Sequence, residues 1–442
     1  MSSIEQKLSR CNTEYAGLAL AWVWLKRSKL LRFLNHIPLN LKTVRRTPRS
    51  KLEDLLACLM GGIESLGQVD IRMRRDLGLS RDLGLSRALG RSSLADQSLI
   101  SQTLDAFEGF SLERFRSNIV TLLALESRAL SRIGRGRFTI LDLDMTDLPC
   151  SYRCEGATKG RTTGRRGRTV RQLSVVYNHR YREPLDIFLH PGNTNSAGPL
   201  EAIIRALEQS YGWDRALRQV ICWRLDSGYG SDKKLSWLMR RGYQVFAKGY
   251  SSKRAAKWAQ SVEREAWKSV HPTQDVYERD RIRTLTSPHR CLLIRTERTK
   301  VAGYCYSYLA TNLRRWVRPR GYVDFYNQRQ GMEKEIQQIK SVLGLKHKRK
   351  RSFDGMQALA LLTLMANLEL VWFRRSLGLE HLGMKRFIRD VIKTPGFVTS
   401  TWQGIRVQFQ AQNPYYQTVK DWKPAAPLPL FSLQSGTILY KN

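Results

Sequence analysis

One segment combines an aromatic ring, two cations and an acid at spacings that suit one face of a helix. Its sequence is YNQRQGMEKEIQQIK, residues 326–340. At about 100° of rotation per helical residue, a single narrow stripe contains Tyr326, Arg329, Glu333 and Lys340. An apolar stripe adjoins it, formed by Phe325, Met332, Ile336, Ile339 and Leu343. Glu335 falls on the opposite side, so we expect Glu335 to be solvated and Glu333 to be the acid that does chemistry.

Two neighbouring residues bear on how this helix forms. Asp324 precedes the segment and is suited to cap the N-terminus of the helix. Gly331 lies inside the helix, where glycine costs about 1 kcal/mol relative to alanine. Charged residues beside an apolar stripe also occur at the boundary of any solvated helix. The segment indicates an active site only if other acids join it.

Two such acids follow apolar stretches that predict buried strands. Asp144 ends the strand expected in the stretch FTILDLDMTD, residues 138–147, and Asp226 ends the strand expected in QVICWRLD, residues 219–226. Under period-two alternation Asp142 shares a strand face with Asp144, so either acid can be the first metal ligand. Asp147 is expected to lie in a turn.

The positions of these acids predict a metal site. Functional sites gather at the carboxyl ends of strands in an α/β sheet, and the apolar face of the Glu333 helix should pack on the same sheet. Three carboxylates close together repel strongly, and hard divalent cations remove that repulsion. Two bridged Mg²⁺ ions are a recurrent solution for phosphodiester chemistry, and Mn²⁺ can substitute. Arg329 and Lys340 are placed to hold flanking phosphates, and Tyr326 to stack on a displaced base or bond a phosphate.

The charge of the chain points to a polyanionic partner. Its 442 residues carry 75 Lys+Arg against 38 Asp+Glu, a formal net charge of +37. Nucleic acid is the first candidate, because lysine and arginine contacts to phosphate supply most nonspecific affinity. An anionic membrane surface is the second. We expect no membrane association, because residues 15–25 are too short to span a bilayer and residues 356–373 are interrupted by polar side chains.

The cysteines and the N-terminus predict a cytoplasmic protein. Seven scattered cysteines favour reduced thiols. Cys150 and Cys154 are close in sequence, but no second cysteine or histidine pair has the spacing of a zinc site. The first residues lack the layout of a signal peptide.

The N-terminal part of the chain, residues 1–130, is predicted to be a helical DNA-binding region. It contains the hexapeptide RDLGLS twice from Arg75, which we interpret as a local duplication in a basic loop or frayed helix. Residues 94–104 resemble the turn and second helix of a helix-turn-helix, with Ser98, Ser101 and Gln102 able to face DNA. A plain packing helix is the favoured interpretation of that segment.

Beyond residue 130 the periodicity changes and predicts a mixed α/β sheet with helical cover. The first part of this core is predicted at residues 135–248, in the order β-β-β-α-β-α-β. Residues 249–315 are rich in β-branched and aromatic residues and predict a small antiparallel insertion. The core resumes at residues 316–375 with the Glu333 helix, and residues 376–442 form a C-terminal region suited to dimerisation or DNA contact.

Two basic clusters are predicted to contact DNA. Residues 159–171 are either a flexible DNA clamp or a solvated loop, and the net charge favours the clamp, with Arg165, Arg166 and Arg168 as its contacts. Residues 346–351 closely follow the Glu333 helix, and there the predicted contacts are Lys346, Lys348 and Arg349.

Three motifs together resemble the DDE transposases of bacterial insertion sequences. They are Asp144-Met145-Thr146, the run RLDSG around Asp226, and the pattern Tyr-x2-Arg-x3-Glu-x6-Lys. The last pattern is the specific one, and the resemblance runs from about residue 40 to about residue 375. The match to Asp-x-Thr favours Asp144 over Asp142 as the first ligand.

The resemblance implies a ribonuclease H-like catalytic core with a β-rich insertion before the glutamate. By matching position it implies that Asp144, Asp226 and Glu333 are the metal-binding triad and that Tyr326, Arg329 and Lys340 contact DNA. The implied endonuclease activity is cleavage at terminal inverted repeats, followed by joining of the freed 3′-hydroxyl to double-stranded target DNA. A homodimer pairing two ends in the bacterial cytoplasm, associated with the nucleoid, is also implied.

Two other functions fit the composition. A catalytically inactive or domesticated relative would bind DNA without cutting it, although all three acids are present. A basic RNA- or ribosome-associated protein would instead prefer RNA over DNA.

Overall fold

The computed structural model describes residues 10–41, 46–76, 93–160, 167–279, 281–298, 302–313, 318–401, 404–410, 412–422, 433–434 and 437–440. These residues form two compact units. Unit 1 comprises residues 1–122, 153–155 and 337–442, and unit 2 comprises residues 123–152 and 156–336. Most of the hexapeptide repeat lies outside the described residues, as do Arg165 and Arg166.

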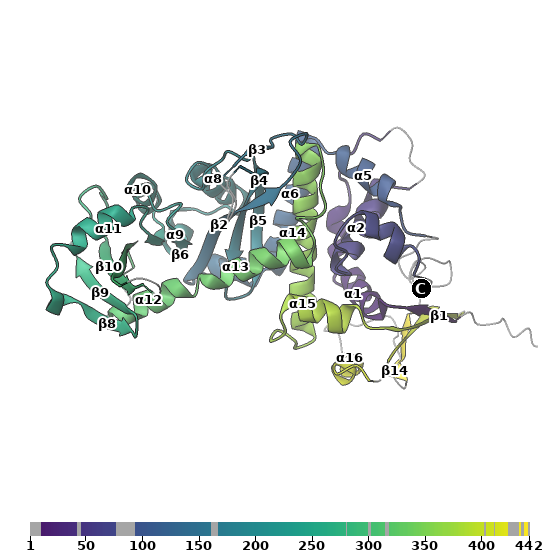
Figure 1. Cartoon of the computed structure of the whole chain (residues 1–442). Coiled ribbons are helices and arrows are strands. Elements are labelled where there is room, and N and C mark those ends of the chain that lie inside the picture. Colours follow the sequence, from purple (N-terminus) through teal and green to yellow (C-terminus); the bar gives the residue numbers. More distant parts are fainter. Residues whose placement is uncertain are drawn as a thin grey trace, which may run out of the picture. The chain divides into compact units, whose positions relative to one another are not determined.

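Unit 2 is built on a mixed sheet whose central strands have a ribonuclease H-like order (Figure 1). The order is β5-β4-β2-β6-β7. Strand β4 runs antiparallel to β2, whereas β6 and β7 continue the sheet in parallel. The bounds are β2 (Thr139–Pro149), β4 (Thr169–Asn178), β5 (Glu183–His190), β6 (Ile221–Leu225) and β7 (Gln244–Lys248). The predicted mixed α/β fold is confirmed.

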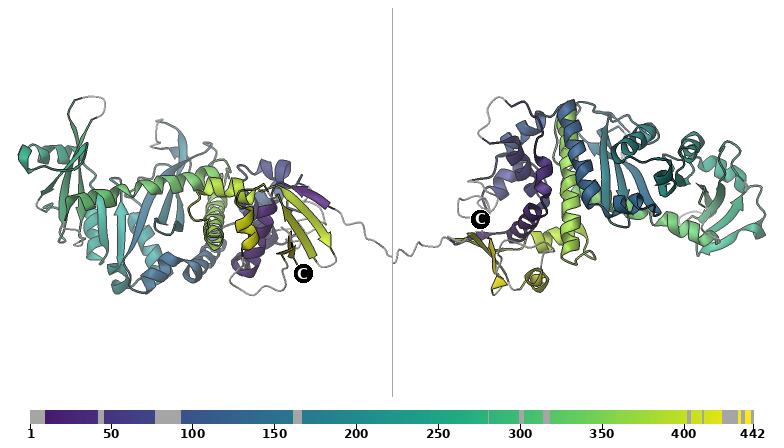
Figure 2. Two further views of the ribbon diagram at one scale, coloured as in Figure 1. Left: turned by 90° about the horizontal axis from the view of Figure 1, so that it is seen from below. Right: turned by 180° about the vertical axis from the view of Figure 1, so that it is seen from behind.

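The segment between β7 and the predicted glutamate helix extends this sheet. Strand β11 pairs antiparallel with β7, and β10 and β11 form a long hairpin (Figure 2). The further order is β11-β10-β9-β8, while the short β3 pairs with β4 at the other side. The bounds are β3 (Thr158–Lys159), β8 (Lys268–His271), β9 (Gln274–Arg279), β10 (Arg290–Glu297) and β11 (Tyr304–Thr311). The antiparallel insertion is therefore continuous with the core sheet.

Helices of unit 2 cover and connect these strands. Their bounds are α7 (Arg128–Gly134), α8 (Leu200–Tyr211), α9 (Arg215–Gln219), α10 (Asp232–Arg240), α11 (Ser252–Ala259), the 3-10 turn η3 (Arg264–Ala266), α12 (Pro319–Asn327) and α13 (Gln330–Gln337). Helix α12 packs on β8 and β9. It buries Tyr322, Val323 and Phe325 in one apolar cluster with Phe246 of β7. Burial of this face fixes the segment that leads to Glu333.

Unit 1 is largely helical, as predicted for the N-terminal region. Its helical elements are α1 (Ala16–Arg27), η1 (Leu30–Leu34), α2 (Pro48–Met60), η2 (Val69–Met73), α5 (Gln97–Asp105), α6 (Gly109–Glu126, which ends in unit 2), η4 (Gln338–Val342), α14 (Phe353–Ser376), α15 (Met384–Phe387), η5 (Ile388–Ile392) and α16 (Tyr416–Asp421). A second sheet has the order β1-β12-β13-β15-β14. Its strands are β1 (Arg10–Thr13), β12 (Gly396–Thr401), β13 (Gly404–Phe409), β14 (Leu433–Gln434) and β15 (Thr437–Tyr440). The first strand of the chain thus pairs with the C-terminal region.

Helix α14 is the central helix of unit 1. It packs against α1, α2 and α5. By length and composition alone it could cross a membrane, contrary to the expectation from sequence, but its apolar window lies entirely inside the protein. A core helix of a folded domain meets the same criterion, so we draw no membrane assignment from it.

A buried ion pair joins three elements of unit 2. Arg224 donates from Nε and Nη2 to the two carboxylate oxygens of Asp142, at 2.6 and 2.8 Å. Its Nη1 donates to the carbonyl of Phe325 at 2.8 Å. Both side chains are almost fully buried, so β2, β6 and α12 are tied together by a charge pair that has no access to water. Asp142 is therefore committed to a structural role, which removes it as an alternative to Asp144.

We predict that Asp142→Ala lowers the free energy of unfolding by about 3–5 kcal/mol, because it leaves the Arg224 guanidinium buried without a counter-charge. Urea unfolding followed by circular dichroism measures this. The matched control is Asp275→Ala, which breaks the partly exposed pair of Asp275 with Arg295 and should cost about 1 kcal/mol or less. Equal losses in the two variants would contradict the structural role of Asp142.

Candidate active site

The pairing of β2 with β6 places two predicted acids side by side. The last parallel partners are Leu143 and Leu225, so Asp144 and Asp226 follow at the same level. Neighbouring strands lie about 4.8 Å apart. Asp144 does not end its strand as predicted, because β2 continues to Pro149 through its pairing with β4. The acid instead lies where the parallel pairing of β2 ends.

Backbone amides fix the orientation of both carboxylates. The amide of Met145 donates to Asp144 Oδ1 at 2.9 Å. The amide of Gly228 donates to Asp226 Oδ1, also at 2.9 Å, in a tight turn after β6. Farther along this loop, Gly230 passes so close to the carbonyl of Lys248 that a Cβ there would collide with it. The sequence DSGYG thus holds Asp226 in a compact loop.

One guanidinium lies between the two aspartates. Arg329 Nη2 is 3.1 Å from Asp144 Oδ1 and 4.0 Å from Asp226 Oδ2. Burial raises the pKa of Asp144 to about 6; Arg329 opposes this rise, whereas the negative charges of Asp226 and Glu333 add to it. The third predicted acid is therefore within electrostatic range of Asp144.

The segment that carries Glu333 is not the single regular helix we expected. Helix α12 ends at Asn327, Gln328 and Arg329 form a turn, and α13 begins at Gln330. Glu333 consequently lies in the first turn of α13. It is exposed, whereas Glu335 is buried, so the predicted solvation of Glu335 is wrong. The prediction failed because Glu335 was judged by its position opposite Glu333, although on the same helix it borders the apolar stripe of Met332 and Ile339, which the fold buries.

Two other expectations about this segment need correction. Helix α12 starts at Pro319 with Arg318 as its N-cap, so Asp324 lies inside the helix, where it pairs with His271 Nε2 at 2.8 Å. Asp147 lies within β2 and not in a turn, because it pairs with Gln172 of β4. Neither acid is part of the candidate site.

Tyr326 lies at the end of α12 with its ring stacked on Phe246, 6.4 Å between centroids. Burial raises the pKa of its hydroxyl to about 12, with Asp226 and Asp144 contributing in the same direction and Arg329 opposing. The hydroxyl therefore remains protonated at neutral pH and can donate a hydrogen bond. One ring face is occupied by the protein core.

Sequence reasoning missed three residues around the acids. His179 lies against Gly331 of α13. The pKa of the buried Tyr229 is raised by burial and by the charges of Asp144 and Asp226. Arg224 pairs with Asp142. The sequence contains a signal for this pair, because Arg224 lies two residues before Asp226, just as Asp142 lies two residues before Asp144.

The contact with His179 explains why residue 331 is glycine. A Cβ built on Gly331 would collide with the imidazole ring. His179 Nδ1 is buried and has no hydrogen-bond partner among the described residues. The pKa of the imidazole is lowered by burial and by Arg224, so the ring packs as a neutral group.

The donor chemistry of the acids fits a hard divalent cation. Asp144 and Asp226 offer only oxygen ligands, and both already face one positive charge. Among the described residues, no three histidine, cysteine, aspartate or glutamate side chains converge as a preformed metal cluster. Glu333, the third predicted ligand, is exposed in the first turn of α13.

The predicted cationic contacts fall into different environments. Arg168 and Arg349 are exposed, whereas Lys346 is half-buried. Lys340 is half-buried on the π-helical turn η4 of unit 1. Lys348 is buried, and its Nζ donates to the carbonyls of Ile63 and Leu343, so we withdraw it from the predicted phosphate contacts.

Two residues of the helix-turn-helix-like segment, by contrast, are available for contact. Ser98 and Gln102 of α5 are exposed, whereas Ser101 accepts a hydrogen bond from Lys350 Nζ.

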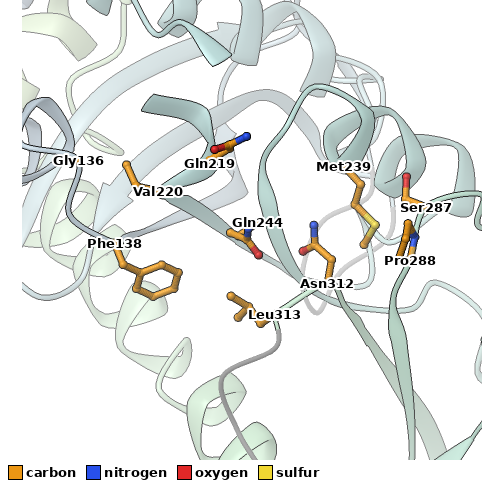
Figure 3. A pocket seen from close by; sticks show the side chains of 10 residues that line it. All are labelled: Gly136, Phe138, Gln219, Val220, Met239, Gln244, Ser287, Pro288, Asn312 and Leu313. Carbon is orange, nitrogen blue, oxygen red and sulfur yellow. The ribbon is translucent and has the colours of Figure 1, made fainter. Parts of the chain in front are cut away.

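A cavity near the core sheet lies away from the acids. It has a volume of about 670 Å³ and is shown in Figure 3. Its walls include Val220, Gln244 and Asn312, at the amino ends of β6 and β7 and the end of β11. Asp144 and Asp226 lie toward the carboxyl ends of β2 and β6, so this cavity is not the candidate site.

A ribonuclease H-like sheet with two aspartates at neighbouring strand positions and a following glutamate helix defines the DDE class of nucleic-acid enzymes. The family model described as "Transposase DDE domain" matches residues 135–368, more than half of the chain. The chain belongs to this family.

Solved structures give more distant similarities. A piggyBac transposase synaptic complex with hairpin DNA is 14% identical with a TM-score of 0.47, covering 87% of this chain and 82% of that one. A pre-cleavage Mos1 transpososome is 16% identical with a TM-score of 0.18, covering 50% of this chain and 65% of that one. No curated protein matches the chain.

We predict that Gly331→Ala destabilises the protein by about 1–3 kcal/mol, because the added methyl group overpacks against His179. Helix propensity alone predicts the opposite sign, a gain of about 1 kcal/mol. The free energy of unfolding in urea decides between them. In a His179→Ala background the collision is removed, and Gly331→Ala should become neutral or stabilising. The same effect in both backgrounds would show that the two residues do not interact.

Proposed function

We propose that the protein is a transposase that cleaves phosphodiester bonds at the ends of a bacterial insertion sequence and joins the 3′-hydroxyl ends to target DNA. The observation that carries this proposal is the register of β2 and β6, which sets Asp144 and Asp226 side by side around one cation in a transposase DDE domain. The order of the signature residues Tyr326, Arg329, Glu333 and Lys340 supports the assignment to insertion sequences.

Asp144, Asp226 and Glu333 would hold Mg²⁺, or Mn²⁺ in its place, as the metal-binding triad. Divalent ions bound there would stabilise the attacking and leaving oxygens of the phosphodiester. The chain itself orients two of the carboxylates through the amides of Met145 and Gly228. The burial of Asp144 limits competition from water at the reacting phosphate.

The cations of the chain would bind the DNA. A net charge of +37 favours association with a polyanion, and Arg168, Lys346 and Arg349 are accessible for phosphate contacts. Tyr326 and Arg329 would hold the strand near the acids, and Lys340 would also contact DNA. We place Arg165 and Arg166 together with Arg168 in the DNA clamp of residues 159–171, on the basis of the sequence alone.

Two further features belong to the proposal. Pairing the two ends of an element requires two active sites, so we propose a homodimer in the synaptic complex. We also propose that the protein acts in the bacterial cytoplasm, at the nucleoid, where its DNA substrates are. An inactive DNA-binding relative is the alternative, and the presence of all three acids favours the active enzyme.

We predict that Asp226→Ala lowers Mg²⁺-dependent cleavage of terminal-repeat DNA by at least about a thousandfold, because one metal ligand is lost. DNA affinity should be retained. Gel assays of nicking and of binding measure the two properties separately. The control Asp275→Ala makes the same charge change on β9 and should cleave normally. Cleavage by Asp226→Ala at the wild-type rate would refute the assignment of the site.

A second prediction separates two neighbouring cations. Arg349→Ala should weaken DNA binding and lower the slope of log affinity against log salt by about one unit, because one phosphate contact is lost. Lys348→Ala should leave that slope unchanged but destabilise the protein by about 1–3 kcal/mol, because it deprives the carbonyls of Ile63 and Leu343 of a donor. Salt-dependent fluorescence anisotropy and thermal unfolding measure the two effects. If the variants exchanged these phenotypes, the assigned environments would be wrong.

A further inference from the structure

Arg329 lies beside the two aspartates that would hold a metal ion. Its Nη2 lies 3.1 Å from an oxygen of Asp144 and 4.0 Å from an oxygen of Asp226. The side chain is buried, with 8% of the residue exposed. In this arrangement the guanidinium is the counter-charge for two carboxylates at adjacent strand positions. A divalent cation and the guanidinium would repel each other strongly if both stayed there.

The hydrogen bonding of Arg329 is incomplete. Its Nε and Nη2 are buried and have no hydrogen-bond partner among the described residues. The contact with Asp144 is thus one of charge and proximity, without a well-directed hydrogen bond. Buried N–H groups without acceptors cost free energy, so a ligand that supplies acceptors would be favoured. Phosphate oxygens match the planar fork of a guanidinium.

The backbone around Arg329 is held in place. Its amide donates to the carbonyl of Tyr326 at 2.9 Å, and its carbonyl accepts from the amide of Met332 at 2.8 Å. The turn is therefore anchored to α12 on one side and to α13 on the other. Release of the aspartates would then take place by a rotation of the long side chain, without a movement of the helices.

We propose that Arg329 serves as a resident counter-ion that keeps the metal site closed until DNA arrives, and that a DNA phosphate draws the guanidinium away from Asp144 and Asp226. This inference rests on the proposed function. Metal binding and DNA binding would then strengthen each other, because the metal displaces the guanidinium of Arg329 from the aspartates and a DNA phosphate binds it. This coupling also ties metal loading to the presence of substrate, so the free protein would hold metal weakly.

The experiment measures binding of Mn²⁺ to the full chain by electron paramagnetic resonance of the free ion, with and without a short mixed-sequence DNA duplex. The variants are Arg329→Gln, which removes the charge, and Lys334→Gln, which makes the same change at an exposed position of α13. Asp226→Ala lacks a metal ligand and supplies the background of Mn²⁺ bound by the DNA alone. Thermal unfolding checks that each variant is folded.

Without DNA, Arg329→Gln should bind Mn²⁺ about tenfold more tightly than the wild type, whereas Lys334→Gln should match the wild type. DNA should tighten Mn²⁺ binding by the wild type but not by Arg329→Gln. Arg329→Lys retains a positive charge and should keep the weak binding of the wild type, which guards against an effect of altered folding.

Equal or weaker Mn²⁺ binding by Arg329→Gln without DNA would overturn the counter-ion role while leaving the metal site intact. Wild-type Mn²⁺ binding by Asp226→Ala would have a different meaning, because it would refute the metal site itself and the proposed function with it.

Discussion

Two aspartates at the same level of neighbouring parallel strands are the constraint on which the rest of unit 2 depends. The pairing of Leu143 with Leu225 forces Asp144 and Asp226 together, and two carboxylates at that separation repel each other unless a cation lies beside them or one of them takes up a proton. In this structure the cation is Arg329. The turn between α12 and α13, the burial of α12 on the insertion strands and the contact of Gly331 with His179 all serve to hold that region in place.

Strands β2 and β6 carry a second pair of charged residues two positions earlier, and the charges of this pair have opposite signs. Asp142 and Arg224 neutralise each other and are sealed from water. The pair of Asp142 and Arg224 thus stabilises the sheet, whereas the pair of Asp144 and Asp226 retains an excess of negative charge. A fold can maintain such an excess when a ligand compensates it, which is the arrangement expected at a functional site.

Much of this arrangement could be predicted from the sequence. Alternating and apolar runs identified the strands β2, β4, β5 and β6, and the mixed α/β fold and the family relationship are confirmed. On each strand a charged residue lies two positions before the aspartate of the site, Asp142 on β2 and Arg224 on β6. This spacing indicates that Asp142 and Arg224 form a structural pair, but only once the pairing register of the two strands is known.

Other features depended on tertiary structure. The helical wheel for residues 326–340 assumed unbroken geometry, whereas Gln328 and Arg329 form a turn, and the solvation predicted for Glu335 overlooked that this residue borders the buried apolar stripe. The basic run at residues 346–351 gave no sign that Lys348 and Lys350 point inward, because burial of a lysine depends on carbonyl and carboxylate partners distant in sequence. The domain boundaries and the roles of the predicted site residues remain predictions.

The most direct measurement is anomalous diffraction from crystals of the protein grown with Mn²⁺ and DNA. We expect an anomalous peak between the carboxylates of Asp144 and Asp226, with Arg329 turned away from both. A peak coordinated by other acids, or full Mn²⁺ loading with Arg329 still between the two aspartates, would contradict it.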